Sequence, residues 1–138
     1  MTEMTEMTDI EKAREFFYKD KYATEATGIQ IDEIGEHYSK CSMKITENHR
    51  NAYGGVMGGA IFTLADFTFA VASNFNAPQT VSVTSQINYT GMAKGEKLIA
   101  EAKVIKDGRS TCLYEIIITD DKETQVAFVT ITGMKLSR

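Results

Sequence analysis

Six stretches of the chain alternate apolar and polar residues, the pattern of β-strands that are buried on one face. The stretches are residues 27–35, 38–46, 80–90, 96–106, 110–119 and 124–136. Gly35 ends the first stretch, and the sequences GMAKG, DGR and DDKE separate the last four; glycine and aspartate are typical turn residues. The alternation therefore predicts two strands joined by a turn, followed later by four more strands.

Two other segments have the periodicity of helices. Residues 9–19 predict a short amphipathic helix with Asp9 as its N-cap. Residues 57–76 are mostly apolar and predict a long buried helix, which Pro78 stops because proline cannot continue a helix. The polar segment 47–55, which precedes this helix, is predicted to be a loop.

One apolar helix and one antiparallel sheet suggest that the sheet curls around the helix and covers it on several sides. No low-complexity linker divides the chain, so we expect one α+β domain over residues 1–138, with residues 1–8 as a frayed leader. The central helix contains an acid, several hydroxyls and two asparagines, and no basic belt follows it. These features argue against a membrane span.

Charge and cysteine content narrow the classes of function. A formal net charge of -4 and the lack of a basic run argue against a nucleic-acid partner. Cys41 and Cys112 are too few for a disulfide framework, and no signal segment opens the chain, so we expect buried thiols and a cytoplasmic location. His37 and His49 lie apart from both cysteines, so no metal site is expected, and His49 is predicted to lie on the loop surface.

Asp66 is the single charged residue of the long apolar helix. At 100° per residue one side of this helix is bulky, whereas the side with Asp66 is mostly small and leaves space beside the carboxylate. Gly59 and Ser73 share that side, and we assign both to substrate binding. No Lys or Arg occurs in residues 51–93, so a cation that pairs with Asp66 must come from far along the chain. The pattern favours a functional carboxylate over a structural one.

Gly54, Gly55, Gly58 and Gly59 lead into the same helix and do not fit a nucleotide-binding loop. Glycines here either let the helix cross closely against the sheet or leave N–H groups free for an oxyanion, and the spacing alone does not decide between these. The helix rise separates Gly58 from Asp66 by about 12 Å. One substrate carbonyl could therefore reach both groups only if a second subunit places its helix alongside.

Taken with these residues, the chain resembles the hotdog-fold acyl-CoA thioesterases of the phenylacetate-degradation type over nearly all its length after the first helix. The matching segments are Asn51, GGVMGG, TLAD, INYTGMAKGE and KDGRS. The resemblance implies a sheet wrapped around the central helix, a homodimer and commonly a homotetramer. It also implies hydrolysis of an acyl-CoA thioester, with coenzyme A as part of the substrate and no separate cofactor.

The resemblance assigns roles to individual residues. Asp66 falls on the catalytic acid, as general base or nucleophile, and an ordinary pKa of about 4 would leave it ionised at neutral pH. Gly58 falls on the oxyanion-hole glycine, and Asn51 on the amide that positions the carbonyl or the water. Ser82 or Thr84 corresponds to a hydroxyl that helps to hold the attacking water.

One position departs from the family pattern. The usual histidine before Gly-Gly is Met57 here, and methionine cannot donate a hydrogen bond. We still assign Met57 to substrate binding. The alternative is that the chain forms a non-catalytic acyl-CoA-binding dimer. A hydratase is disfavoured because it would use a histidine with an acid, and no histidine follows residue 49. Arg109, with Lys94 and Lys97, is among the few cations available to the phosphates of coenzyme A.

Overall fold

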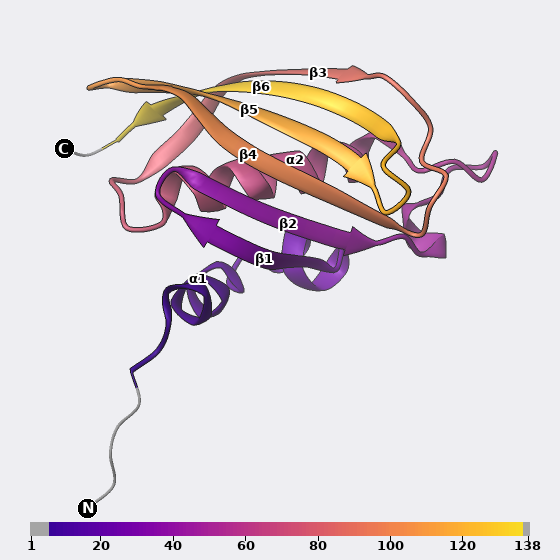
Figure 1. Cartoon of the computed structure of the whole chain (residues 1–138), viewed down its shortest axis with the longest axis horizontal. Coiled ribbons are helices and arrows are strands. Elements are labelled where there is room, and N and C mark those ends of the chain that lie inside the picture. The colour runs from indigo at the N-terminus through magenta and orange to yellow at the C-terminus, as the bar shows by residue number, and fades with distance from the viewer. Residues whose placement is uncertain (1–5, 137–138) are drawn as a thin grey trace, which may run out of the picture.

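The predicted long helix is present and lies inside a curved sheet (Figure 1). The structure, a computed structural model, describes residues 6–136. Its elements are α1 (Asp9–Phe17), a π-helical turn (Tyr22–Ala26), β1 (Ile29–Gly35), β2 (Tyr38–Lys44), a 3-10 turn (Glu47–His49), α2 (Gly58–Asn74), β3 (Thr80–Tyr89), β4 (Lys97–Asp107), β5 (Thr111–Asp120) and β6 (Gln125–Lys135). The two predicted helices and the six predicted strands are confirmed, whereas the π-helical turn and the 3-10 turn were not predicted.

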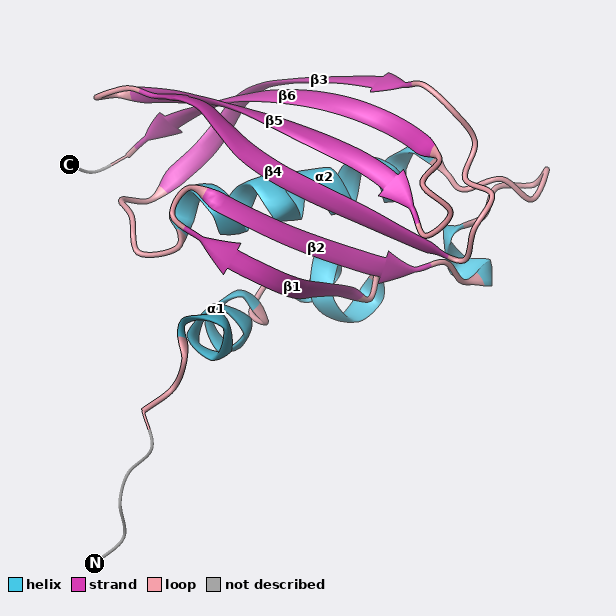
Figure 2. Cartoon of the chain, in the orientation of Figure 1, coloured by secondary structure: helices cyan, strands magenta, loops and turns pink. Residues whose placement is uncertain are grey.

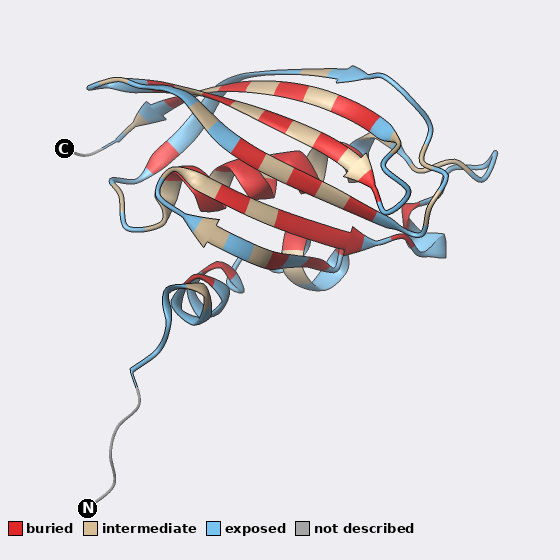
Figure 3. Cartoon of the chain, in the orientation of Figure 1, coloured by how far each residue is buried: buried red, intermediate tan, exposed pale blue. Residues whose placement is uncertain are grey.

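The strands of the described residues form one antiparallel sheet in the order β1-β2-β4-β5-β6-β3 (Figure 2). Buried and half-buried residues alternate along the first half of β4 and along β5 and β6, because one face of each strand covers α2 (Figure 3). Leu64, Thr68 and Val71 of α2 are fully buried, as the bulky side of this helix predicted. The α+β hotdog fold is confirmed.

The two edges of the sheet differ in how they are covered. The Nε of Arg14 in α1 donates to the carbonyl of Ile31 in β1 at 2.9 Å, so α1 lies against the β1 edge. Within residues 6–136, β3 pairs with β6 alone, and nearly all of its length is exposed (Figure 3). Val81 and Val83 of β3 are 39% and 56% exposed. An open edge of this kind is a template for another strand.

The prediction that Asp9 caps the first helix is wrong by one residue. Thr8 is the N-cap: its hydroxyl accepts from the N–H of Glu11 at 3.3 Å, and the Glu11 carboxylate accepts from the N–H of Thr8 at 2.9 Å. This reciprocal pair needs an acid three residues after the cap, which only Thr8 has. Of the predicted leader, residues 1–5 lie outside the described residues.

The prediction that His49 lies on the surface is also wrong. The side chain is 6% exposed, and its Nε2 donates to the carbonyl of Thr27 at 2.8 Å while its Nδ1 accepts from the N–H of Thr46 at 3.0 Å. These partners require the neutral ring with the proton on Nε2. The carbonyl of His49 in turn accepts from Met57 at 2.8 Å, so this buried ring anchors the approach to α2.

Both cysteines are buried, as predicted. Burial raises the pKa of the Cys41 thiol to about 12, and burial also raises the pKa of Cys112. Thiols of this kind are poor nucleophiles because the reactive thiolate is scarce.

Candidate functional site

The N-terminus of α2 opens onto a cavity of about 470 Å³. We call it the Gly58 cavity. Three segments line it, namely the loop before α2, the first turn of α2 and the connection from β3 to β4. Among the lining residues are Arg50, Asn51, Gly55, Gly58, Tyr89 and Met92. The structure therefore brings two of the predicted catalytic residues, Asn51 and Gly58, to one cavity.

The first backbone N–H groups of α2 are available at this cavity. Met57 occupies the N-cap position, and its side chain makes no capping hydrogen bond. The carbonyl of Met57 accepts from Ala60 and Ile61 at 3.0 and 3.2 Å, whereas within residues 6–136 the N–H groups of Gly58 and Gly59 have no acceptor. The dipole of the helix favours negative charge at this end, so these two groups suit an anion or an oxyanion.

Tyr89, which no local sequence pattern marks as a site residue, packs closely against Gly58. Its hydroxyl donates to the carbonyl of Gly58 at 3.0 Å. A Cβ at position 58 would lie 2.9 Å from the hydroxyl oxygen of Tyr89 and 3.0 Å from its Cζ, so the Tyr89 side chain, which is 53% exposed, would have to shift. Glycine at position 58 therefore permits the close packing that was one of the two sequence alternatives, and the oxyanion alternative stays a prediction.

Asn51 shapes the loop that carries it. Its Oδ1 accepts from the N–H groups of Tyr53 and Gly55, at 2.9 and 3.0 Å, as in an Asx turn. Gly54 in this turn has a φ of 89°, a conformation that favours glycine. In the part of the chain that the structure describes, the Nδ2 of Asn51 has no acceptor, so this amide can still donate to a ligand in the Gly58 cavity.

Asp66 lies two turns further along α2, on a separate cavity of about 300 Å³. We call it the Asp66 cavity. Its walls are Asp20, Lys21, Tyr22 and Ala23 on one side and Thr63, Asp66, Phe67 and Ala70 of α2 on the other. Asp66 is half-buried, and the described residues offer it no hydrogen bond and no ion pair. The space predicted beside the carboxylate is therefore present.

The surroundings of Asp66 shift its pKa away from that of an ordinary aspartate. Burial, and secondarily the carboxylate of Asp20, raise the pKa of Asp66. Lys21, which is distant from Asp66 in the sequence, lines the cavity but does not pair with Asp66. Its Nζ lies 3.6 Å from the centroid of the Tyr18 ring and 3.9 Å from a carboxylate oxygen of Glu25.

Ser73 does not reach either cavity, contrary to its assignment to substrate binding. It is 4% exposed, and its hydroxyl donates to the carbonyl of Phe69 at 2.8 Å. A serine inside a helix commonly bonds to the carbonyl four residues earlier, and helical projection alone does not show this. Gly59 does face open space, since a Cβ there would meet no atom within 4 Å, and Met57 is 49% exposed.

Ser82 and Thr84 lie on the exposed β3 edge and line neither cavity of this chain. The pairing of β3 with β6 is irregular between them, so Val83 has no partner in the ladder. Both hydroxyls are therefore available only to something that approaches the open edge from outside.

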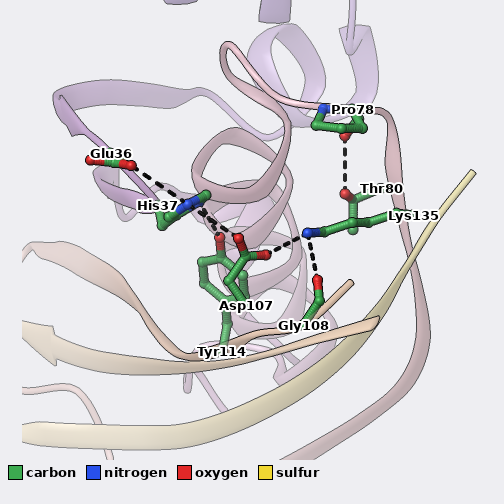
Figure 4. Close-up of polar contacts among 8 residues, drawn as sticks. All are labelled: Glu36, His37, Pro78, Thr80, Asp107, Gly108, Tyr114 and Lys135. Atoms are coloured by element: carbon green, nitrogen blue, oxygen red, sulfur yellow. Dashed lines mark hydrogen bonds and ion pairs between the residues drawn. The ribbon is translucent and has the colours of Figure 1, made fainter. Parts of the chain in front are cut away.

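Arg109 lies at the far end of the sheet from the Gly58 cavity. It belongs to the hairpin between β4 and β5, which a polar cluster holds in place (Figure 4). The Nζ of Lys135 donates to a carboxylate oxygen of Asp107 at 2.8 Å and to the carbonyl of Gly108 at 2.7 Å, and the Nε2 of His37 lies 3.4 Å from Asp107. The eleven residues of β4 span roughly 33 Å, so Arg109 does not reach the Gly58 cavity of its own chain.

Two further properties concern residues 6–136. They contain no group of three His, Cys, Asp or Glu side chains placed as metal ligands. None of their helices is long and apolar enough to cross a membrane.

Comparison with known sequences finds related proteins. The thioesterase superfamily matches residues 53–127. A putative esterase of Archaeoglobus fulgidus is 34% identical over 86% of this chain and 77% of its own length, and the acyl-coenzyme A thioesterase PaaI of Escherichia coli is 31% identical over 80% and 79%.

Solved structures agree as well. The structure of Escherichia coli PaaI has a TM-score of 0.86 and 25% identity over 94% of both chains. A hypothetical thioesterase of Streptococcus pneumoniae, solved with coenzyme A, has a TM-score of 0.81 over 88% of this chain and 98% of its own, and at 22% identity it shows the shared fold alone. The chain therefore belongs to the thioesterase superfamily, as a hotdog-fold thioesterase of the phenylacetate-degradation type.

Proposed function

We propose that this chain hydrolyses an acyl-CoA thioester to the free acid and coenzyme A. The observation that carries the proposal is an unpaired, half-buried carboxylate, Asp66, on the same helix as the unpaired N–H groups of Gly58 and Gly59. The substrate class is supported by the acyl-coenzyme A thioesterase PaaI, to which the chain is similar over most of its length.

The catalytic unit is a homodimer in this proposal. Gly58 and Asp66 are eight residues apart on one helix, about 12 Å along its axis, and line separate cavities. Two antiparallel copies of α2 would place the N-terminus of one beside the acid of the other, as a two-fold axis allows. The open β3 edge, with exposed Val81 and Val83, is a surface suited to a second copy, and Ser82 and Thr84 on this edge would enter a site only in such a dimer.

The reaction follows from these groups. The thioester carbonyl accepts from the N–H of Gly58, and the negative charge that develops on its oxygen is stabilised at the helix N-terminus. Asn51 supplies a second donor from Nδ2. Because the side chain of Met57 has no hydrogen-bond donor, this oxyanion site depends on backbone N–H groups and on Asn51.

Asp66 acts in one of two ways. As a general base it takes a proton from water, whose oxygen attacks the carbonyl carbon, and the coenzyme A thiolate leaves. As a nucleophile it attacks directly, the thiolate leaves, and water hydrolyses the mixed anhydride. A raised pKa makes Asp66 a stronger base in the first route and a stronger nucleophile in the second than an ordinary aspartate.

The test is thiol release from aryl-, short- and medium-chain acyl-CoAs, with wild type and Asp66→Asn measured side by side and their oligomeric state checked. We expect turnover of at least one ester by the wild type and loss of turnover in an assembled variant. If neither protein releases thiol and both bind acyl-CoA, the chain is the non-catalytic binder that Met57 allows. The same oligomer measurement separates a dimer from a tetramer.

A further inference from the structure

The outer wall of the Asp66 cavity comes from the segment between α1 and β1. Asp20, Lys21, Tyr22 and Ala23 line the cavity opposite α2. This wall is fixed in place rather than loose. The N–H of Asp20 donates to the carbonyl of Phe17 at 3.0 Å, its carbonyl accepts from the N–H of Thr24 at 2.9 Å, and the rings of Phe17 and Phe67 meet edge to face at 6.4 Å.

Some charged groups of this cavity have partners and others have none among residues 6–136. Its titratable side chains are Asp20, Lys21 and Tyr22 from the wall and Asp66 from α2. Lys21 is engaged with Tyr18 and Glu25, as described above. Neither carboxylate, Asp20 nor Asp66, has a hydrogen-bond or ion-pair partner among residues 6–136. Asp66 therefore faces a second carboxylate across the cavity.

We propose that Asp20 is a positioning residue for the hydrolysis, whose negative charge makes Asp66 a stronger base. This inference rests on the proposed function of Asp66, and nothing in the family resemblance assigns a role to residue 20. A like charge across a shared cavity favours the protonated form of its neighbour. A substrate that displaces water from the cavity strengthens this effect, because the effective dielectric constant falls.

The pKa values of the two groups agree with this arrangement. Burial and then Asp20 raise the pKa of Asp66, whereas burial alone raises the pKa of Asp20. The difference follows from position: Asp20 lies at the exposed rim and Asp66 is half-buried.

The pH profile of kcat/KM tests this proposal, with wild type compared to Asp20→Asn. The matched control is Asp32→Asn, which removes the same charge from β1, outside the Asp66 cavity. We expect the rate of Asp20→Asn to fall off at lower pH, so that its ratio of kcat/KM at pH 5 to that at pH 7.5 rises about two- to fivefold. The control should leave this ratio unchanged, and 1 M salt should reduce the difference. An unchanged ratio in Asp20→Asn would overturn the proposal.

A carboxyl NMR titration tests the same pair without turnover. The side-chain 13C resonance of Asp66, assigned by its loss in Asp66→Asn, is followed against pH in wild type and in Asp20→Asn. We expect it to titrate at lower pH in the variant, and an unchanged midpoint would overturn the proposal. If the midpoint moves although no acyl-CoA is hydrolysed, the coupling of the carboxylates holds and the proposed function alone fails.

Discussion

Asp66 and Asp120 are two aspartates of one chain in opposite surroundings. Asp120 is 2% exposed, and its carboxylate accepts from four backbone N–H groups. The donors are Lys94 at 2.7 Å, Gly95 at 2.9 Å, Lys122 at 2.9 Å and Thr124 at 2.8 Å. Burial acts to raise the pKa of Asp120, but these hydrogen bonds outweigh it and hold the pKa well below its usual range. Asp66 has no such donors, and its pKa is raised.

This difference distinguishes an acid that stabilises the fold, Asp120, from one that is available for a reaction, Asp66. Asp120, at the end of β5, ties its own turn to the connection between β3 and β4, and Met92 in that connection lines the Gly58 cavity. Asp121 adds to this, since its Oδ1 accepts from the N–H of Glu96 at 2.9 Å. A fully satisfied carboxylate stabilises the backbone around it, whereas an unsatisfied one remains available to a substrate.

The largest expected effect comes from replacing Asp66. Asp66→Asn should lower kcat by about 10²- to 10⁴-fold, because the base or nucleophile is lost. The Tm at pH 7.5 should not fall and should rise slightly, since a neutral amide is easier to bury than an unpaired charge. Thiol release and thermal unfolding check both parts. A Tm several degrees lower would show that Asp66 stabilises the fold and would break the contrast with Asp120.

The reverse result is expected for Asp120. In Asp120→Asn an NH2 group replaces one oxygen and faces backbone donors that it cannot satisfy, so the Tm should fall by roughly 5–10 °C. Asp32→Asn is a suitable control, because Asp32 is half-buried and accepts no hydrogen bond within the described residues. Equal Tm values for these two variants would contradict a structural role for Asp120.

The elements that the sequence predicts are those that local pattern determines. Alternation located every strand, and an apolar run ended by Pro78 located α2 to within two residues at each end. Asp66 could be identified from the sequence because a single acid in an apolar helix is unusual whatever its neighbours in the fold are. Gly58 was recognisable because the glycines lie next to it in sequence.

The missed residues act through partners that are distant in the sequence. Tyr89 bonds to Gly58 across 31 positions, Asp120 to Lys94 across 26, and His49 to Thr27 across 22. Asp20 lines the same cavity as Asp66 only because the α1–β1 segment folds over α2. No periodicity encodes such pairings, since they depend on which strands and turns become neighbours in the folded chain.

Gly58 extends the comparison of Asp66 with Asp120. The connection between β3 and β4, whose backbone donates to Asp120, also lines the Gly58 cavity. Gly58→Ala should lower kcat/KM about tenfold, since the new Cβ forces a shift of the Tyr89 side chain, which lines the Gly58 cavity and donates to the Gly58 carbonyl. Its Tm should also fall. In Gly59→Ala the new Cβ meets open space, and the Tm should rise slightly because alanine is the better helix former. If the two variants have the same Tm, contact with Tyr89 is not what requires glycine at position 58.

The smallest effect expected is the pH dependence of stability, and it has opposite signs at the two aspartates. A carboxyl with a lowered pKa stabilises the fold above its unfolded pKa of about 3.9, and this contribution is lost as the pH falls toward the lowered value. The stability difference between wild type and Asp120→Asn should therefore shrink from pH 6 to pH 3.

Asp66 should behave in the reverse way. Its raised pKa favours the fold below the unfolded value, and this contribution is lost as the pH rises through the folded pKa. The advantage of Asp66→Asn over wild type should therefore grow from pH 4 to pH 7. Urea unfolding midpoints of the three proteins at each pH measure both trends. If wild type gained stability relative to Asp66→Asn as well as relative to Asp120→Asn as the pH rises, the two carboxylates would share one kind of environment, and the assignment of Asp66 to chemistry would lose its electrostatic basis.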